Sequence, residues 1–392
     1  MKKIIVSFIV CLIVIFFAYQ IKNESISNLV QSIPLFNTKK IEMYNNDFKI
    51  NKLQIKNSDY YYNKLDEKQK IIYSNIAINV NKLNKKFKLY GYEITDYDAI
   101  SKDTAKAINA FFNDHPEVFY LNSKYKLNIS ESLISKFVSL ELSYSVKNIY
   151  ELDDNIDKIS KEIELYKFNE KDIFNLELLI HDKLAKDVSY SKGDLDNLPD
   201  SKHTIYGAFI EKDTVCDGFT KALQILFDKV GIESILVSGK IDSGPHALNM
   251  VKLDNKWYYL DITSNKYIKE NNDTSKNIAH TYFNVTEKYI LKTHTIDNIN
   301  ELYKADSEEY NYFNKTNSYI TSIDNFDWKL KNIVELQKNN DKLEFRTDYT
   351  NDVPNKIIKV LYDINFNNYK KQGSSVKLQY YNLIDTYIVE KK

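Results

Sequence analysis

The chain has 392 residues and an apolar content of 43%, which is enough for two or three domains with cores of their own. Its formal net charge is zero, and its basic residues form no long run. Phosphate binding needs a concentrated positive surface, so the composition argues against nucleic acid as the main partner.

The first 22 residues are predicted to direct the chain to a membrane. Lys2 and Lys3 precede an apolar run at 4–19, as in a signal peptide or a signal anchor. A cleavage site after Ala18 would put the bulky Phe16 where a small residue is needed, so an uncleaved single-pass anchor is favoured. With the lysines inside the cell, the rest of the chain is expected outside. If the segment is cleaved, the protein is secreted.

Two regions are expected between this segment and the catalytic domain. Residues 23–58 are polar and poorly periodic, which suggests a stalk. Residues 59–165 are expected to form a small α+β module with a helical connector. Asp66 and Gln69 have the spacing of a capping box, and an apolar stripe continues to Phe87. The remaining elements predicted there are a helix at 101–113 and strands at 118–121, 125–129 and 138–144.

Two further domains follow. Residues 166–299 are expected to carry the chemistry, and a strong helical pattern opens this domain between Ile173 and Val188. Residues 300–392 are predicted to form a small C-terminal α+β domain. Its expected elements are a helix at 326–337, a strand at 343–349, a helix after Pro354, a strand at 376–381 and one more strand. The fold class is therefore α+β, with small modules on both sides of the catalytic domain.

Cysteine usage singles out one thiol. Cys11 lies in the apolar N-terminal segment, so Cys216 is the only thiol in the part expected outside. That part cannot form an internal disulfide, and a lone thiol in an oxidising environment is a liability unless it is buried or used. An inert core cysteine is the alternative to a reactive one.

The residues after Cys216 predict a buried helix that begins at the thiol. Apolar side chains recur at helical spacing from Phe219 to Val230, and Gly231 ends the pattern. The free N–H groups and positive dipole at a helix N-terminus stabilise a thiolate and can bind the oxyanion of a tetrahedral intermediate. This placement therefore suits a nucleophile.

A predicted β-hairpin supplies a candidate base. Residues 247–253 and 256–260 are expected to form strands joined by a two-residue turn. In that register Leu248 faces Asp261, so His246 lies diagonal to Asp261 on the same face, about 7–8 Å away at the backbone. The spacing predicts a pair in which Asp261 orients the His246 ring and stabilises its charged form.

Three segments resemble the core motifs of the transglutaminase-like superfamily. They are residues 215–219, 246–249 and 257–263, in the family's order of cysteine, histidine and aspartate. The similarity covers roughly residues 172–289, and residues 114–119 resemble, more weakly, a module that precedes this domain in many bacterial surface proteins. The resemblance implies a papain-like core in which Cys216 attacks an amide, His246 moves the proton and Asp261 holds His246.

The sequence departs from the family at the expected substrate groove. Leu248 stands where a tryptophan is frequent, and Ser264-Asn265 follow Thr263 where Trp-Asp is frequent. The acyl group on Cys216 could pass to water, as in a protease or deamidase, or to an amine, as in a cross-linking enzyme. Leu248 favours a less enclosed site and hence hydrolysis. The expected substrate is a protein or peptide, with cell-surface and cell-wall peptides as candidates.

Other interpretations of the same residues remain open. An inactive fold that serves as a cell-surface binding or scaffold module is the rival class. Tyr206 could complete the oxyanion hole, and Asn249 could support the His–Asp pair, although packing roles fit both. No metal or cofactor is expected, because a zinc site would need a further nearby ligand and no EF-hand loop is present. The remaining histidines were assigned to packing (His181) or to loops and the surface (His115, His203, His280 and His294).

Overall fold

The computed structural model describes residues 53, 58–92, 96–131, 136–194, 197–266, 278–340, 342–349, 353–363, 376–381 and 385–391. The predicted membrane segment and nearly all of the predicted stalk lie outside these ranges. Within them, no helix has the length and apolar character needed to cross a membrane. The described chain divides into two compact units: one contains residues 65–108 and 126–141, and the other contains 58–64, 109–125 and everything from 142 onward.

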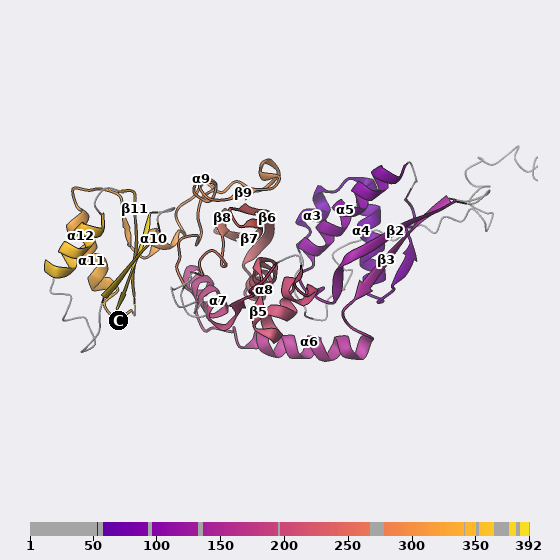
Figure 1. The fold of residues 1–392 in the computed structure, drawn as a ribbon, viewed down its shortest axis with the longest axis horizontal. Coiled ribbons are helices and arrows are strands. Elements are labelled where there is room, and N and C mark those ends of the chain that lie inside the picture. Colours follow the sequence, from indigo (N-terminus) through magenta and orange to yellow (C-terminus); the bar gives the residue numbers. More distant parts are fainter. Residues whose placement is uncertain are drawn as a thin grey trace, which may run out of the picture. The chain divides into compact units, whose positions relative to one another are not determined.

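The first unit contains helices and most of a three-stranded sheet (Figure 1). Helix α4 (Glu67–Val80) begins with the predicted capping box, in which Asp66 and Gln69 bond each other's backbone. The prediction that the helical stripe continues to Phe87 is wrong. The chain turns at Leu83, whose φ is 53°, and residue 87 lies in strand β1 (Lys86–Lys88).

The sheet of this region has the order β1-β3-β2, with β1 antiparallel to β3. Its longer strands are β2 (Leu121–Glu131) and β3 (Lys136–Tyr144), so one continuous strand replaces the two predicted between residues 118 and 129. Helix α5 (Tyr97–Asp114) precedes β2 and matches the predicted helix at 101–113.

The second unit contains the region that carries the three motifs. Helix α6 (Ile149–Glu164) leads to α7 (Ile173–Asp187), which begins at the Asp172 cap. Helix α8 (Cys216–Lys229) packs on β6 (Glu233–Ile241) and β7 (Gly244–Leu253) (Figure 1). The sheet order is β8-β7-β6-β9, completed by β8 (Lys256–Leu260) and the short β9 (Thr295–Ile296). A separate parallel pair joins β4 (Ser189–Tyr190) to β5 (Asp213–Thr214).

The hairpin that carries the candidate base has the predicted register. Leu253 pairs with Lys256 and Asn249 pairs with Leu260, so the strands meet at a two-residue turn. Asp254 and Asn255 in that turn have φ values of 45° and 62°, as a type I′ turn requires. Because the register holds, His246 and Asp261 lie on one face of the hairpin.

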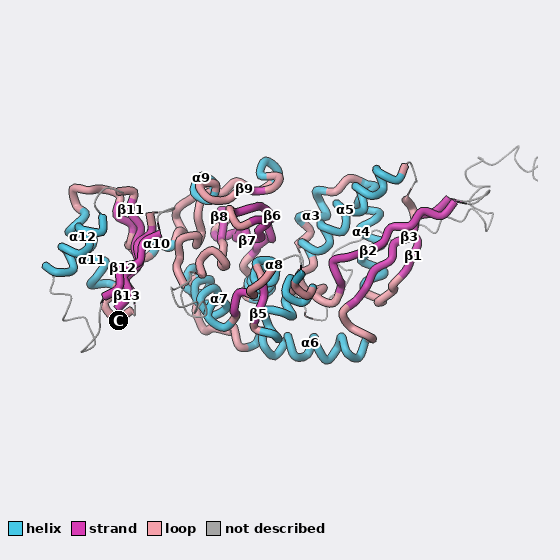
Figure 2. The backbone as a smooth tube through the Cα atoms, in the orientation of Figure 1, coloured by secondary structure: helices cyan, strands magenta, loops and turns pink. Residues whose placement is uncertain are grey.

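The C-terminal part of the second unit is a four-stranded sheet with two helices (Figure 2). The order is β10-β11-β13-β12, with β10 (Tyr319–Ile320) parallel to β11 (Lys342–Thr347) and the other pairs antiparallel. Strand β12 (Val376–Tyr381) and the final β13 (Thr386–Lys391) confirm the last two predicted strands. Helices α11 (Phe326–Leu336) and α12 (Val353–Asp363) pack with this sheet around one apolar core. Short helices α9 (Glu287–Ile290) and α10 (Tyr312–Lys315) precede it.

One buried carboxyl group in α7 is held in its neutral form. Glu177 is fully buried, and its Oε2 accepts a hydrogen bond from Asn284 Nδ2 at 2.7 Å. Oε1 of Glu177 and Oδ1 of Asn284 are both buried and have no other partner in the described chain. Burial raises the pKa of Glu177 to about 8 against the weaker opposing effect of that amide.

Replacement of Glu177 by Gln should make the stability of this unit less sensitive to pH. The pKa of Glu177 is about 8 in the folded protein against an ordinary value of 4.5 in the unfolded chain, so unfolding releases a proton between these pH limits. Stability should therefore fall as pH rises through that window, by up to ~1.4 kcal/mol per pH unit relative to the variant. Urea unfolding at pH 5.5 and 7.5 measures this difference. The exposed Glu164→Gln variant serves as a control, and equal pH dependence of all three proteins would contradict the prediction.

Candidate active site

Cys216 is the first residue of α8 and has a buried, unpaired thiol. Val215 before it is extended, and its side chain does not cap the helix, so the first backbone N–H groups of α8 lie near the sulfur. Gly218 allows the close approach of this helix end to its neighbours. A Cβ at this position would lie 1.8 Å from Thr214 Oγ1 and 2.8 Å from the Thr204 carbonyl oxygen. The local packing therefore requires glycine two residues after the cysteine.

The His246 ring lies between Cys216 and Asp261. Its Nε2 is 2.8 Å from Asp261 Oδ2, and it also forms a side-chain hydrogen bond with Cys216, for which Nδ1 is left. Burial disfavours a charged ring, but the charge and hydrogen bond of Asp261, together with Cys216, raise the pKa of His246 to about 10. The ring is therefore cationic at neutral pH and favours a thiolate beside it.

Asp261 is fully buried and accepts five hydrogen bonds. Its Oδ1 accepts from the Thr263 backbone at 3.0 Å, the Thr263 hydroxyl at 2.8 Å and the Ser264 backbone at 3.0 Å. Its Oδ2 accepts from His246 at 2.8 Å and from His294 at 3.0 Å. Burial opposes the charge, yet the two histidines hold the pKa of Asp261 well below its usual range. Asp261 is thus a permanent carboxylate that orients His246.

The second histidine on Asp261 was missed by the sequence analysis. His294 was assigned to a loop or the surface, but its side chain is 1% exposed. Its Nε2 lies at Asp261 Oδ2, and its Nδ1 lies 2.9 Å from Thr293 Oγ1. The assignment of His115 and His280 to the surface is also wrong, because both are buried. His203 is 31% exposed, and its Nδ1 lies 3.2 Å from Asp217 Oδ2.

Tyr190 is another residue that the sequence did not reveal. Strand β4 pairs with β5 so that Tyr190 lies opposite Thr214, two residues before the nucleophile. The phenol forms a hydrogen bond with the Cys216 side chain and another with the Cys216 backbone. Burial first, and then the charge and hydrogen bond of Cys216, raise the pKa of Tyr190. Its hydroxyl therefore stays protonated and can donate beside the sulfur.

Tyr206 and Asn249, the other two sequence candidates, each contact a residue outside the triad. The ring of Tyr206 stacks on Phe119 with centroids 6.0 Å apart, so the structure gives it a packing contact. Asn249 donates from Nδ2 to the Thr220 carbonyl oxygen at 3.2 Å and thereby joins β7 to α8. Asn249 supports the helix that carries Cys216 rather than the imidazole.

Two groups of side chains within the described residues could by composition hold a metal ion. They are His246, Asp261 and His294, and His181, Asp182 and His280. In each group one carboxylate oxygen already lies at hydrogen-bond distance from both rings. At Asp261 this contact orients the His246 ring, which also bonds to Cys216. The arrangement of the first group is therefore suited to acid–base chemistry with the thiol.

Comparisons with known proteins give partial similarities. No protein-family model and no curated protein matches the chain. Among solved structures, a TGase (transglutaminase) shares 18% identity at a TM-score of 0.27, covering 48% of this chain and 54% of that one. A proposed cysteine protease from Cytophaga hutchinsonii shares 13% at 0.25, covering 44% and 65%. A proposed protease from Parabacteroides distasonis shares 11% at 0.22, covering 36% of each chain.

The chain spans about half the length of the first of these structures.

Replacement of Asp261 by Asn should raise the pH needed to alkylate Cys216. The neutral amide removes most of the influence that holds the His246 pKa near 10, so the ring loses its charge and the thiolate loses its partner. The wild-type protein should therefore be labelled by iodoacetamide at neutral pH. In the variant, we expect labelling at neutral pH to be at least several-fold slower, and to recover at higher pH.

Mass spectrometry of Cys216 labelled across pH 5–10 measures the shift. The exposed Asp242→Asn variant controls for the loss of a surface charge. If Cys216 of the wild-type protein reacts only after denaturation, the interpretation of Cys216 as an inert core cysteine is favoured instead.

Proposed function

We propose that this protein is a transglutaminase-like cysteine enzyme that cleaves an amide bond in a protein or peptide. The observation that carries the proposal is the placement of His246 between the buried thiol of Cys216 and the buried carboxylate of Asp261. A scaffold would have no need for a buried carboxylate that keeps a histidine charged beside a thiol, since burial of such charges is costly.

The first half of the proposed reaction forms a thioester. The Cys216 thiolate attacks the amide carbon, a C–S bond forms, and the carbonyl electron pair moves onto oxygen. The Cys216 backbone N–H and the Tyr190 hydroxyl are the candidate donors to that oxyanion. His246 then gives its Nδ1 proton to the leaving nitrogen as the C–N bond breaks. Asp261 keeps its charge throughout and gives up no proton.

The second half releases the acyl group. The neutral His246 removes a proton from the attacking water or amine, a new bond forms at the acyl carbon, and the sulfur leaves as a thiolate. Attack by water gives hydrolysis, and attack by a lysine side chain gives a cross-link. The triad is the same in both cases, so the surroundings decide the outcome.

The packing of nearby aromatic residues favours hydrolysis. Trp257 to Tyr259 could have walled a tunnel for a lysine, but they take part in the core. Trp257 stacks on Tyr303 with centroids 4.2 Å apart, and Tyr258 donates to Ser307 at 3.0 Å. Tyr259 and Leu248 belong to one buried apolar cluster. We therefore propose a protease or deamidase in preference to a cross-linking enzyme.

The decisive experiment separates the possible products. The wild-type protein is incubated with a panel of glutamine-rich proteins and a labelled primary amine, and the Cys216→Ala variant is treated in the same way. We expect shortened fragments, or a mass gain of one dalton from deamidation, with the wild type alone. Incorporation of the amine would establish amine transfer instead. If neither the wild type nor Cys216→Ala changes any substrate, the proposal fails and the interpretation of the protein as a binding or scaffold module is favoured.

Replacement of Tyr190 by Phe should lower kcat on any such substrate by roughly 10²–10³, the usual effect of removing one oxyanion donor. Alkylation of Cys216 at neutral pH should survive, because His246 and Asp261 are untouched. Steady-state kinetics with the best substrate measures the loss. Tyr206→Phe is the matched control and should be unaffected. Equal kcat for Tyr190→Phe and wild type would remove Tyr190 from the mechanism.

We also propose that the enzyme acts outside the cell and is tethered by its first 22 residues. The support is the Lys2-Lys3 pair before the apolar run at 4–19. Protease added to cells stripped of their wall should digest the catalytic domain and spare a cytoplasmic marker. The mature protein should stay with membranes in high salt. Recovery of a soluble form that begins near residue 20 would show cleavage instead.

A further inference from the structure

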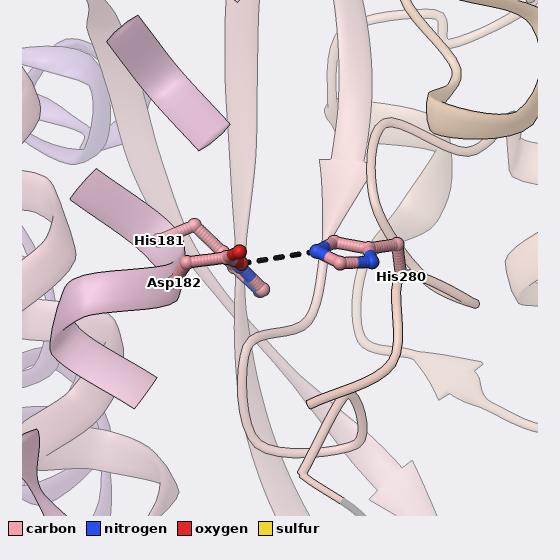
Figure 3. Close-up of side chains that lie close together, drawn as sticks. All are labelled: His181, Asp182 and His280. Carbon is pink, nitrogen blue, oxygen red and sulfur yellow. Dashed lines mark hydrogen bonds and ion pairs between the residues drawn. The ribbon is translucent and has the colours of Figure 1, made fainter. Parts of the chain in front are cut away.

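A second buried group of charges lies behind the turn that carries Asp261. Asp182 on α7 and His280, from the segment before α9, face each other with 3.0 Å between Oδ1 and Nε2 (Figure 3). His181 lies beside Asp182 on the same helix, 2.9 Å from Nδ1 to the same oxygen. The proposed mechanism uses none of these residues, although His181 and His280 are both fully buried.

The proton positions in this group follow from Asn265. Its Oδ1 accepts from the Tyr282 backbone at 2.8 Å, so its Nδ2 is the atom that faces His181 Nε2 at 3.2 Å. Nε2 of His181 must then accept, which puts the proton on Nδ1 and directs it at Asp182. A ring in this tautomer cannot offer Nδ1 to a metal ion. The group is therefore held by hydrogen bonds.

His280 carries a positive charge in this arrangement. Its Nε2 faces Asp182, and its Nδ1 lies 2.9 Å from Oε2 of Glu344 on β11. Both carboxylates accept, so both ring nitrogens must donate. The ring also stacks on Tyr312 of α10 with centroids 3.9 Å apart. Burial opposes the charge, but Glu344 and Asp182 raise the pKa of His280 to about 8.

The other charged neighbours support this assignment. Lys342 on β11 lies with its Nζ 2.9 Å from Glu344 Oε2. Burial alone would raise the pKa of Glu344, but the positive charges of Lys342 and His280 outweigh it and lower this pKa to about 2. Lys266 binds the Ala185 and Val188 carbonyl oxygens at the end of α7. Arg346 of β11 donates to the Thr281 carbonyl oxygen at 2.7 Å, next to His280 in sequence. His181 is held neutral because burial lowers its pKa.

The same group is joined to the catalytic aspartate through Asn265. The Asn265 N–H donates to the Asp261 carbonyl oxygen at 3.1 Å and closes the turn whose N–H groups hold Asp261 Oδ1. The Asp261 N–H donates to the Tyr282 carbonyl oxygen at 3.1 Å. We use the name His280 chain for the continuous series of hydrogen bonds through Glu344, His280, Asp182, His181 and Asn265.

We propose that Glu344, on the C-terminal sheet, is a positioning residue for Asp261 that acts by keeping His280 charged. The inference rests on the proposed function of the triad. A neutral His280 has one N–H and can donate to only one of its two carboxylates, so the other contact becomes repulsive and the His280 chain breaks. The turn that fixes Asp261 then loses its support. The C-terminal domain thus becomes part of the catalytic apparatus.

The pH dependence has a definite sign. His280 has a raised pKa, about 8 against an ordinary value of 6.5, so its contribution is complete below pH 6.5 and is lost as pH rises through 8. The His246 pKa is about 10, so its own deprotonation occurs at higher pH. Turnover by the wild type should therefore fall near pH 8 before His246 is affected.

The fall in turnover near pH 8 is the alkaline limb of the pH–rate profile. Two substitutions should move this limb in opposite directions. Glu344→Gln removes one anion from His280, and the limb should shift to lower pH by a unit or more, with at least a several-fold loss of kcat at pH 7.5. Lys342→Gln leaves Glu344 with fewer competing cations, and the limb should shift to higher pH. The exposed Glu335→Gln on α11 is the matched control and should leave the profile unchanged.

The experiment combines pH–rate profiles of the four proteins with NMR titration of the histidine Cε1 protons. His280 should titrate near pH 8 in the wild type and lower in Glu344→Gln. A neutral wild-type His280 at pH 7, or a limb that no variant moves, overturns the inference. The wild-type NMR titration keeps this test valid if Glu344→Gln does not fold. A wild type with no reactive thiol would instead refute the proposed function, whatever His280 does.

Discussion

The burial of the Asp261 carboxylate is the constraint on which the rest of the site depends. A charge without solvent must be matched by donors, and Asp261 has five, supplied by the turn after β8 and by two histidines. To deliver those donors, the hairpin register, the position of β9 and the shape of the turn must all be correct. The orientation of His246 toward Cys216 follows from that arrangement.

Three buried carboxyl groups show how the number of donors decides the charge. Glu177 receives one amide hydrogen bond and is neutral, with a pKa of about 8. Glu344 receives the His280 backbone and ring and the Lys342 ammonium, and its pKa is about 2. Asp261, with five donors, is also charged. Burial is similar in all three cases, so the nearby cationic groups, together with the hydrogen bonds they donate, make the difference.

Local signals in the sequence predicted the central geometry. The apolar spacing after Cys216 gave its place at a helix start, and the Asp254-Asn255 turn gave the register of His246 and Asp261. These features depend on residues close together in the chain, where periodicity and turn chemistry are informative.

Tyr190 and His294 could not be found in that way. Tyr190 lies in a two-residue strand, and His294 directly precedes another, so neither has a periodic pattern around it. Their positions come from pairing with segments more than 20 residues away. His280 was misassigned for a similar reason, because its burial depends on Glu344 of a separate sheet. The prediction of a helix up to Phe87 failed for the opposite reason. Apolar residues keep their helical spacing past Leu83, but the chain turns there.

The contacts of β11 bear on where this protein can be divided. Glu344 and Arg346 satisfy the backbone and ring of His280 and the carbonyl of Thr281, which belong to the sequence region of the three motifs. A fragment cut near residue 299 would keep those groups and lose their partners. Each orphaned buried group costs on the order of 1–3 kcal/mol. A piece of the protein that contains Cys216 is therefore expected to be less stable without β11 than with it.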